Sequence, residues 1–196
     1  MTALPSDPAD LSYAYRPSVL GATWSFRLTP AAIAWDAGRK SGHVPYGDVT
    51  QVRLSFRPAT LQTYRFVAEV WAKDGTKLQI VSSSWKSMVE QTRLDGDYRA
   101  FIGELHRRLA ASGAPIAFIK GVNPPLYWAG IVVFVATALV TAALITRSIQ
   151  AGAGGAAVLI GGFLAVFLWR LGTYFRRNRP GLYAPEALPA ELMPDG

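Results

Sequence analysis

Two long apolar runs dominate the hydrophobic pattern of the chain. Residues 126–146 read LYWAGIVVFVATALVTAALIT, and a second uncharged run covers 148–169 after the single residue Arg147. About 20 apolar helical residues, rising 1.5 Å each, cross a hydrocarbon core about 30 Å thick. The pattern therefore predicts a transmembrane helical hairpin over 126–175, with spans at about 126–146 and 153–174.

Before the apolar runs, residues 21–84 alternate between apolar and polar side chains with a period of two. This period is typical of strands with one buried face. The clearest examples are 52–57 (VRLSFR) and 64–72 (YRFVAEVWA). Shorter strands are predicted at 22–28, 32–35 and 77–80, with turns at 29–30, 38–42 and 57–58.

The turn at Asp74 and Gly75 allows a prediction of register. A two-residue type I′ loop would place the apolar face of one strand opposite the polar face of the next. A three-residue loop over 73–75 instead pairs Val70 with Leu78, which matches the apolar faces. We therefore expect a type I turn with Gly75 in the left-handed conformation and a G1 bulge.

After Asp95 the period changes to that of an α-helix, with an acidic start and an end at 112–115. Asp95 or Asp97 is expected to cap its N-terminus. One apolar stripe runs along this helix, and it consists of Leu94, Tyr98, Phe101, Ile102, Leu105 and Leu109. A small antiparallel sheet needs its apolar face covered, and such a helix can cover it.

Short antiparallel strands followed by one amphipathic helix resemble a pleckstrin-homology-like (PH-like) domain. The segment 44–52 (VPYGDVTQV) is similar to the phrase that opens the third strand in bacterial members. With two membrane helices attached, the chain resembles small bacterial membrane proteins that carry a PH-like domain. The resemblance implies an α+β fold, in which a small antiparallel β-sandwich or barrel is capped by one C-terminal amphipathic helix. It also implies scaffolding, protein contact or lipid contact, without catalysis.

The predicted organisation has five parts. A flexible N-terminal tail covers 1–20, a cytoplasmic PH-like domain 21–113, and a linker 114–125. The transmembrane hairpin follows at 126–175, and a basic, then proline-rich cytoplasmic tail ends the chain at 176–196. This last tail carries Leu182, Tyr183, Leu188, Leu192 and Met193. We expect it to dock on the domain or on a partner; the alternative is an extended, weakly ordered tail.

The distribution of charge predicts the orientation of the hairpin in the membrane. The formal net charge is +7, and Arg176, Arg177 and Arg179 follow the second span, whereas the hairpin tip holds only Arg147. By the positive-inside rule both termini are cytoplasmic, and the N-terminus lacks the pattern of a signal peptide. We expect a two-pass protein of the bacterial inner membrane. Aromatic residues predicted at the cytoplasmic interface are Tyr127, Trp128, Trp169 and Tyr174.

Arginines on the polar face of two neighbouring strands are the strongest binding candidates. Arg53, Arg57 and Arg65 share this face, and with the three arginines after the second span they are expected to contact anionic lipid. The alternative is a solvated face, because Gln51, Ser55 and Glu69 lie there too.

Small residues in the apolar runs predict close packing of the two helices. The expected packing residues are Ala138, Ala142, Ala157, Gly161 and Ala165. A remaining face, with Val132, Phe134, Val135, Phe163, Val166 and Phe167, is expected to meet lipid or a larger membrane protein. Neither run carries a central charge, which argues against an ion or proton path.

Candidates for chemistry are few. The chain has no cysteine, which excludes disulfides, thiolate metal sites and cysteine nucleophiles. His43 is expected in a turn and His106 at the surface or boundary of the helix. Residues 82–84 (SSS) are interpreted as a polar turn that satisfies backbone groups, and 152–155 (GAGG) as a tight turn. We predict no enzyme activity, metal, cofactor, nucleic acid or small-molecule substrate.

The sequence therefore favours a non-enzymatic, membrane-anchored PH-like module that binds or scaffolds at the bilayer. The alternative is an accessory subunit or assembly factor that docks on a larger membrane protein complex through its hairpin. A stoichiometric partner after purification in mild detergent would favour the second interpretation.

Overall fold

The structure is a computed structural model that describes residues 10–58, 64–87 and 90–194. The chain folds as an α+β protein with antiparallel and mixed sheets and two long apolar helices. It divides into two compact units. One unit, here called the composite domain, joins the chain up to Lys120 to the segment from Gly181 onward. The other is the helical hairpin, 121–180.

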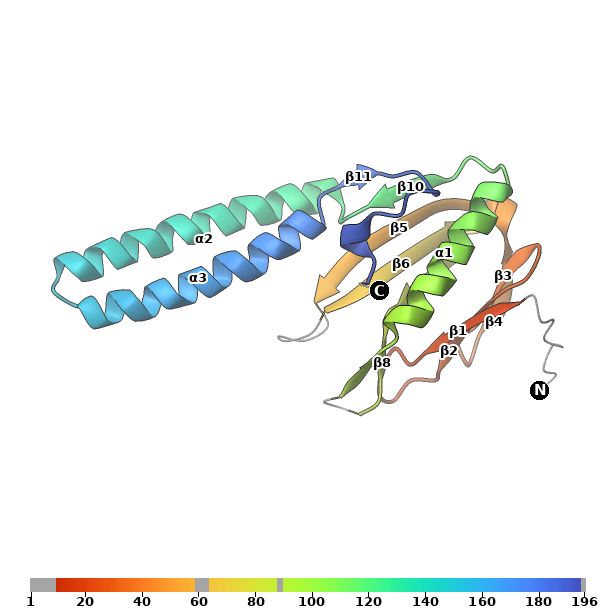
Figure 1. Ribbon diagram of the computed structural model, residues 1–196, viewed down its shortest axis with the longest axis horizontal. Helices are drawn as coiled ribbons and strands as arrows, with labels where there is room; N and C mark the ends of the chain where they lie inside the picture. The colour runs from red at the N-terminus through yellow and green to blue at the C-terminus, as the bar shows by residue number, and fades with distance from the viewer. Residues whose placement is uncertain (1–9, 59–63, 88–89, 195–196) are drawn as a thin grey trace. The chain divides into compact units, whose positions relative to one another are not determined.

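A four-stranded antiparallel sheet opens the composite domain (Figure 1). Its order is β1-β2-β3-β4, and its strands are β1 (Leu11–Tyr15), β2 (Trp24–Leu28), β3 (Ala32–Asp36) and β4 (Ser41–Pro45). The predicted flexible tail over 1–20 is therefore wrong for its described part. Tyr13 and Tyr15 alternate with Ser12 and Ala14 and bury their rings in the core. Residues 1–9 lie outside the described residues.

The second sheet has the order β11-β10-β5-β6-β7. The 3₁₀ turn η1 (Tyr46–Asp48) leads from β4 into β5 (Val49–Pro58), which pairs antiparallel with β6 (Tyr64–Ala72), and β6 with β7 (Lys77–Val81). β10 (Ala117–Lys120) runs parallel to β5, and β11 (Gly181–Leu182) runs antiparallel to β10. The predicted linker 114–125 thus contains a strand, because residues 117–120 complete the ladder beside β5.

The predicted register between β6 and β7 is confirmed. Val70 pairs with Leu78 and Ala68 with Ile80. Gly75 has φ +84°, while no non-glycine residue among those described has positive φ. A left-handed Gly75 in a three-residue loop therefore replaces the type I′ alternative.

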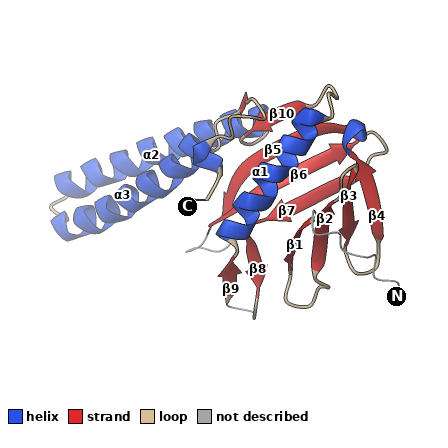
Figure 2. Ribbon diagram, turned by 45° about the vertical axis from the view of Figure 1, so that its right-hand side comes forward, coloured by secondary structure: helices blue, strands red, loops and turns tan. Residues whose placement is uncertain are grey.

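Helix α1 (Asp95–Ala111) follows the small ladder of β8 (Ser83–Trp85) and β9 (Gln91–Arg93) (Figure 2). The predicted stripe is buried from Tyr98 to Leu109, and Tyr98 and Phe101 pack against Tyr13 of β1. The predicted aspartate cap is wrong, since Leu94 is the N-cap residue and no side-chain cap bond forms. Asp95 instead pairs with Arg93.

The C-terminal segment returns to the composite domain and completes its core. After β11 the chain reaches the 3₁₀ turn η2 (Ala190–Leu192), where Leu192 is fully buried and Met193 nearly so. Tyr183 and Leu188 pack partly buried against the same core. The expected docking of the tail on the domain is therefore confirmed, whereas Leu182 is 77% exposed.

The helical hairpin consists of α2 (Pro124–Gln150) and α3 (Gly154–Arg177), both longer than the predicted spans. Each is long and apolar enough to cross a membrane. The tight turn expected at 152–155 forms only in its first part, at Gly152 with φ +74°, because Gly154 and Gly155 already belong to α3. At the other end, Gly121 has φ +78°, and a Cβ there would lie 2.3 Å from the Asn178 carbonyl oxygen, so only glycine fits this close approach.

Candidate functional site

The basic face predicted on β5 and β6 forms as expected. In the ladder Arg57 lies directly opposite Arg65, and Arg53 opposite Glu69. These side chains point away from the face that carries Val52, Leu54 and Phe56 into the core, because successive residues of a strand alternate. We call Arg53, Arg57, Arg65, Glu69 and Lys77 the basic face.

A buried carboxylate divides the arginines of this face into two kinds. Glu69, only 3% exposed, pairs with Arg57 at 2.6 Å and with Lys77 at 2.7 Å. Arg57 also donates from Nε to the Ser55 hydroxyl at 3.1 Å. Since an unpaired buried carboxylate is costly, Arg57 is needed for the stability of the sheet. Because Glu69 holds Arg57, this arginine is less free to contact lipid than predicted.

Arg65 differs from Arg57 in its surroundings. Burial and the nearby charge of Arg57 lower the pKa of Arg65, so its positive charge is poorly compensated. Its Nε is buried without a hydrogen-bond partner, and no carboxylate among the described residues pairs with it. Like charges directly opposite each other destabilise a ladder. An anion between Arg57 and Arg65 would relieve this repulsion.

Arg53 is the second arginine of the basic face without a described carboxylate partner. Its guanidinium lies 5.4 Å from the centre of the Trp71 ring, and the Lys77 ammonium lies 4.9 Å from the same ring. Such cation–π contacts hold the side chains in place without neutralising their charge. Arg53 and Arg65 therefore supply two of the three net positive charges of the basic face, and the third remains because Arg57 and Lys77 share the single carboxylate of Glu69.

The chain leaves and re-enters the composite domain beside this face. Lys120 ends β10 next to Leu54 of β5, and Gly181 pairs with Lys120 across the β10–β11 ladder. Because β10 and β5 are parallel, both run toward Arg57. Only residues 121–123 separate β10 from α2, and only 178–180 separate α3 from β11.

Within the hairpin, the predicted packing residues divide between two sides. Ala157 is buried, and Ala138 and Gly161 are partly buried, but Ala142 and Ala165 are exposed. The expectation is therefore wrong for these last two. Aromatic rings make much of the contact, since Phe134 stacks on Phe167 with centroids 5.5 Å apart.

This ring contact also corrects the predicted outer face of the hairpin, because Phe134 and Phe167 turn inward. Gly130 was missed, and a Cβ there would lie 3.0 Å from the Phe175 ring. Because Gly130 has no Cβ, the ring of Phe175 can pack beside α2. Val132, Val135, Phe163 and Val166 remain exposed, as expected for that face.

The predicted interface aromatics gather at the open end of the hairpin. Tyr127 packs on Phe175 at 5.8 Å, which brings the start of α2 beside the end of α3. Tyr174 packs on the same ring at 5.5 Å. Trp128 and Trp169 are 64% and 73% exposed. Arg176 and Arg179 are exposed at this end, and Arg177 is partly buried.

The two histidines occupy different environments from those predicted. His106, expected near the surface, is fully buried, and burial lowers its pKa to about 4. Its Nδ1–H donates to the Ile102 carbonyl at 2.7 Å, and its Nε2 accepts from the Tyr183 hydroxyl at 2.7 Å. It thereby holds the returning C-terminal segment on α1. His43 lies exposed in β4 rather than in a turn.

Two of the three serines at 82–84 satisfy backbone amides, as predicted for this segment. The Ser82 hydroxyl accepts from the Phe66 amide at 3.0 Å, and the Ser84 hydroxyl from the Arg16 amide at 3.0 Å. Part of this segment forms β8 rather than a turn. These contacts give Ser82 and Ser84 a structural role.

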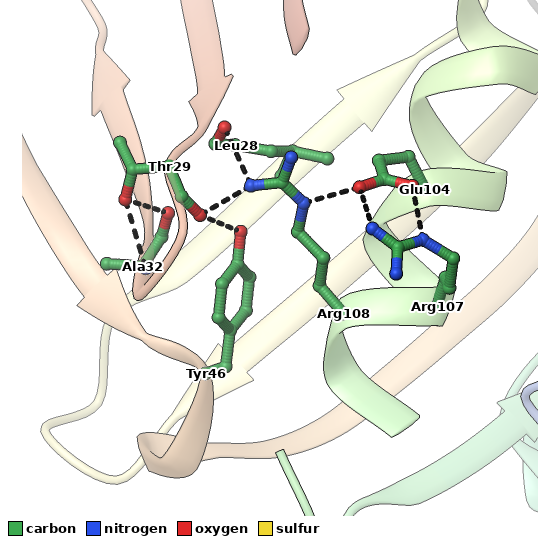
Figure 3. Close-up of polar contacts among 7 residues, drawn as sticks. All are labelled: Leu28, Thr29, Ala32, Tyr46, Glu104, Arg107 and Arg108. Carbon is green, nitrogen blue, oxygen red and sulfur yellow. Dashed lines mark hydrogen bonds and ion pairs between the residues drawn. The ribbon is translucent and has the colours of Figure 1, made fainter. Parts of the chain in front are cut away.

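A second polar cluster joins the end of α1 to the turn between β2 and β3 (Figure 3). Arg108 donates to the Leu28 and Thr29 carbonyls at 3.0 and 2.6 Å, and Glu104 accepts from both Arg107 and Arg108. These bonds lower the pKa of Glu104 to about 2. The cluster borders a hollow of about 520 Å³, but Arg108 and Glu104 are held by these bonds between α1 and the β2–β3 turn, so we assign it a structural role.

No protein-family model, curated protein or solved structure matches this chain.

Proposed function

We propose that the protein is a non-enzymatic, membrane-anchored module of the PH-like kind on the cytoplasmic face of a bacterial inner membrane. The hairpin is its anchor, and the basic face contacts anionic lipid headgroups. Helix α1 serves as the C-terminal amphipathic helix of such a fold. The cations Arg176, Arg177 and Arg179 at the open end, against Arg147 near the tip, support this orientation.

The observation that carries the proposal is the position at which the chain leaves the composite domain. Lys120 lies beside Leu54 of β5, the strand that also carries Arg53 and Arg57. The three residues that follow bridge at most about 14 Å between the Cα atoms of Lys120 and Pro124. This limit is set by the chain and holds for any orientation of the two units. It keeps the edge of the sheet near the surface at which α2 would enter the bilayer.

Charge supplies the attraction. Arg53 and Arg65 have no carboxylate partner among the described residues, and each cation near an anionic surface contributes about 1 kcal/mol. Phosphate oxygens match the fork of a guanidinium. An anionic headgroup next to Arg65 would also offset the repulsion from Arg57.

The test compares full-length protein in nanodiscs of neutral lipid with nanodiscs that contain anionic lipid. We expect slower hydrogen exchange in β5 and β6 with anionic lipid, and loss of this difference in the double variant Arg53→Gln/Arg65→Gln. Arg57 stays intact, because its removal would leave Glu69 unpaired. Arg99→Gln, on the exposed side of α1, is the matched control. Equal exchange in both lipids would contradict the lipid contact.

One observation favours a second function, as an accessory subunit of a larger membrane complex. Ala142 and Ala165 are exposed and take no part in packing within the hairpin. Small residues facing outward allow a partner helix to approach closely. Copurification of a stoichiometric membrane partner, lost in an Ala142→Leu/Ala165→Leu variant, would support this function. A monodisperse protein without a partner in mild detergent would contradict it.

A further inference from the structure

The turn between β1 and β2 presents two apolar residues at its tip. A hydrogen bond of 3.2 Å from the Gly21 amide to the Ser18 carbonyl closes a β-turn, with Val19 and Leu20 at its corners. Turn corners ordinarily carry Gly, Pro, Asn, Asp or Ser. Leu20 is 101% exposed, so it contributes nothing to the core. The choice of residue at this position is not explained by folding.

The rest of the composite domain covers its large apolar side chains. Among its described residues, Leu182 is the only other large apolar residue that is exposed, at 77%. Leu182 follows Gly181, where the chain re-enters the domain after α3. Single exposed apolar residues are common on protein surfaces, so Leu20 is informative only together with its place at the tip of a turn and its neighbours.

Backbone contacts place the turn on the side of the domain from which β10 leads out. β7 runs parallel to β10, and the ladders align Ile80 of β7, through Ala68 and Leu54, with Lys120. β8 continues from β7 past this level, and its Trp85 amide donates to the Arg16 carbonyl at 3.1 Å. Figure 2 shows the β1–β2 turn beside the β8–β9 ladder.

The chemistry of the turn fits a lipid bilayer better than a protein. Arg16 is exposed at the start of the turn, and Trp85, whose amide donates to the Arg16 carbonyl, lies partly buried beside it. Lys86 is exposed next to Trp85 and is paired with Glu90 at 3.2 Å. An apolar tip next to the cation of Arg16 and the amphipathic ring of Trp85 matches the interfacial region of an anionic membrane. Leu20 is a convex tip, and a bilayer accepts such a tip without a complementary pocket.

We propose that the turn at residues 17–21 inserts Val19 and Leu20 into the interface of the bilayer that the hairpin spans. This inference rests on the proposed membrane anchoring. It adds a second, apolar point of attachment to the electrostatic contact of the basic face. Together they would hold the composite domain in one orientation against the membrane.

The experiment uses the absence of native cysteine. A fluorophore is attached to the full-length protein through Ser18→Cys, which keeps Leu20, and the protein is reconstituted with lipids that carry a nitroxide quencher in the acyl chain. Val135→Cys in α2 is the positive control, and Ala110→Cys, exposed near the end of α1, is the control for a site away from lipid.

We expect the Ser18→Cys probe to be quenched at least twofold more than the Ala110→Cys probe, and Leu20→Ser to abolish the difference. If Val135→Cys is quenched while Ser18→Cys equals Ala110→Cys, the insertion is refuted and the anchor stands. If Val135→Cys is not quenched, the proposed anchoring itself fails. Shielding of Ser18→Cys from a water-soluble quencher without quenching by lipid would also refute insertion, because a protein would then cover the turn.

Discussion

Leu192 of the composite domain is fully buried, whereas Phe163 of the helical hairpin is 78% exposed. Both regions are rich in apolar side chains, but most of these are buried in the composite domain and exposed on the hairpin. The composite domain gathers them into one core shared by both sheets, α1 and the C-terminal segment. The hairpin buries only a seam between α2 and α3. An apolar surface of that kind is stable in lipid and unstable in water.

The comparison also shows how the two regions are joined. The hairpin is inserted into the composite domain, because β10 precedes it and β11 follows it in the same sheet. The domain is therefore complete only with residues from both sides of the hairpin. A fragment that ends near residue 113 would lack β10, β11, Leu192 and Met193.

The largest expected effect follows from replacing the hairpin with a short turn. Lys120 and Gly181 are paired in an antiparallel ladder, so an Asn-Gly turn in place of 121–180 would suit the connection. We expect this shortened protein to fold and remain monodisperse in water, whereas the full chain requires detergent or lipid. Gel filtration and circular dichroism measure this. Aggregation of the shortened protein would contradict the separation into two units.

The next effect compares two leucines of the C-terminal segment. Leu192→Ala removes a fully buried side chain and should lower the free energy of unfolding of the domain by about 2–5 kcal/mol. Leu182→Ala, at an exposed position, should change it by less than about 0.5 kcal/mol. Urea unfolding followed by tryptophan fluorescence measures both. Equal effects would mean that the segment does not dock.

The burial of His106 should make the stability of the domain depend on pH. The unfolded chain takes up a proton on His106 near pH 6.5, but burial delays this uptake in the folded domain to about pH 4. The free energy of unfolding should therefore fall as the pH drops from 6.5 to 4, by up to about 3 kcal/mol. Below that range His106 adds no further dependence.

Urea titrations at several pH values test this prediction with a matched pair of variants. His106→Gln should flatten the dependence in this range, while His43→Gln, at an exposed position, should retain it. Glutamine still offers an acceptor to the Tyr183 hydroxyl. An unchanged slope in His106→Gln would show that another group titrates.

A smaller effect concerns the hairpin seam. Phe134→Ala removes ring contacts with Phe167 and Phe175, each at 5.5 Å, and should weaken the association of α2 with α3 by about 1 kcal/mol for each contact. Phe163→Ala, on the exposed side, should have little effect in detergent. Energy transfer between probes on the two helices reports their association. If both variants behave alike, the rings do not hold the seam.

Local patterns predicted much of both regions. The alternation of 64–72 gave β6, the loop at Asp74 and Gly75 gave the register, and the helical stripe gave the buried face of α1. His106 could also have been found, since it lies four residues after Ile102 and three before Leu109 on the same side of a helix.

Features that depend on distant partners escaped prediction. Residues 117–120 become β10 only because β5 offers a parallel edge, and Leu11–Tyr15 becomes β1 through pairing with β2. The arginines of the basic face differ because Glu69 pairs with Arg57 and Lys77 and not with Arg53 or Arg65. This pairing depends on the positions of the side chains on neighbouring strands. In the hairpin, ring packing rather than the spacing of alanines determines the seam.

The most direct test of the account is the side of the membrane on which each end of the hairpin lies. Ala151→Cys at the tip and Ala110→Cys on α1 are both exposed in a chain without native cysteine. In right-side-out vesicles of the bacterial inner membrane, a membrane-impermeant thiol reagent should label Ala151→Cys and should reach Ala110→Cys only after lysis. Labelling of both positions before lysis, or of neither, would contradict a hairpin that crosses the bilayer and anchors a cytoplasmic domain.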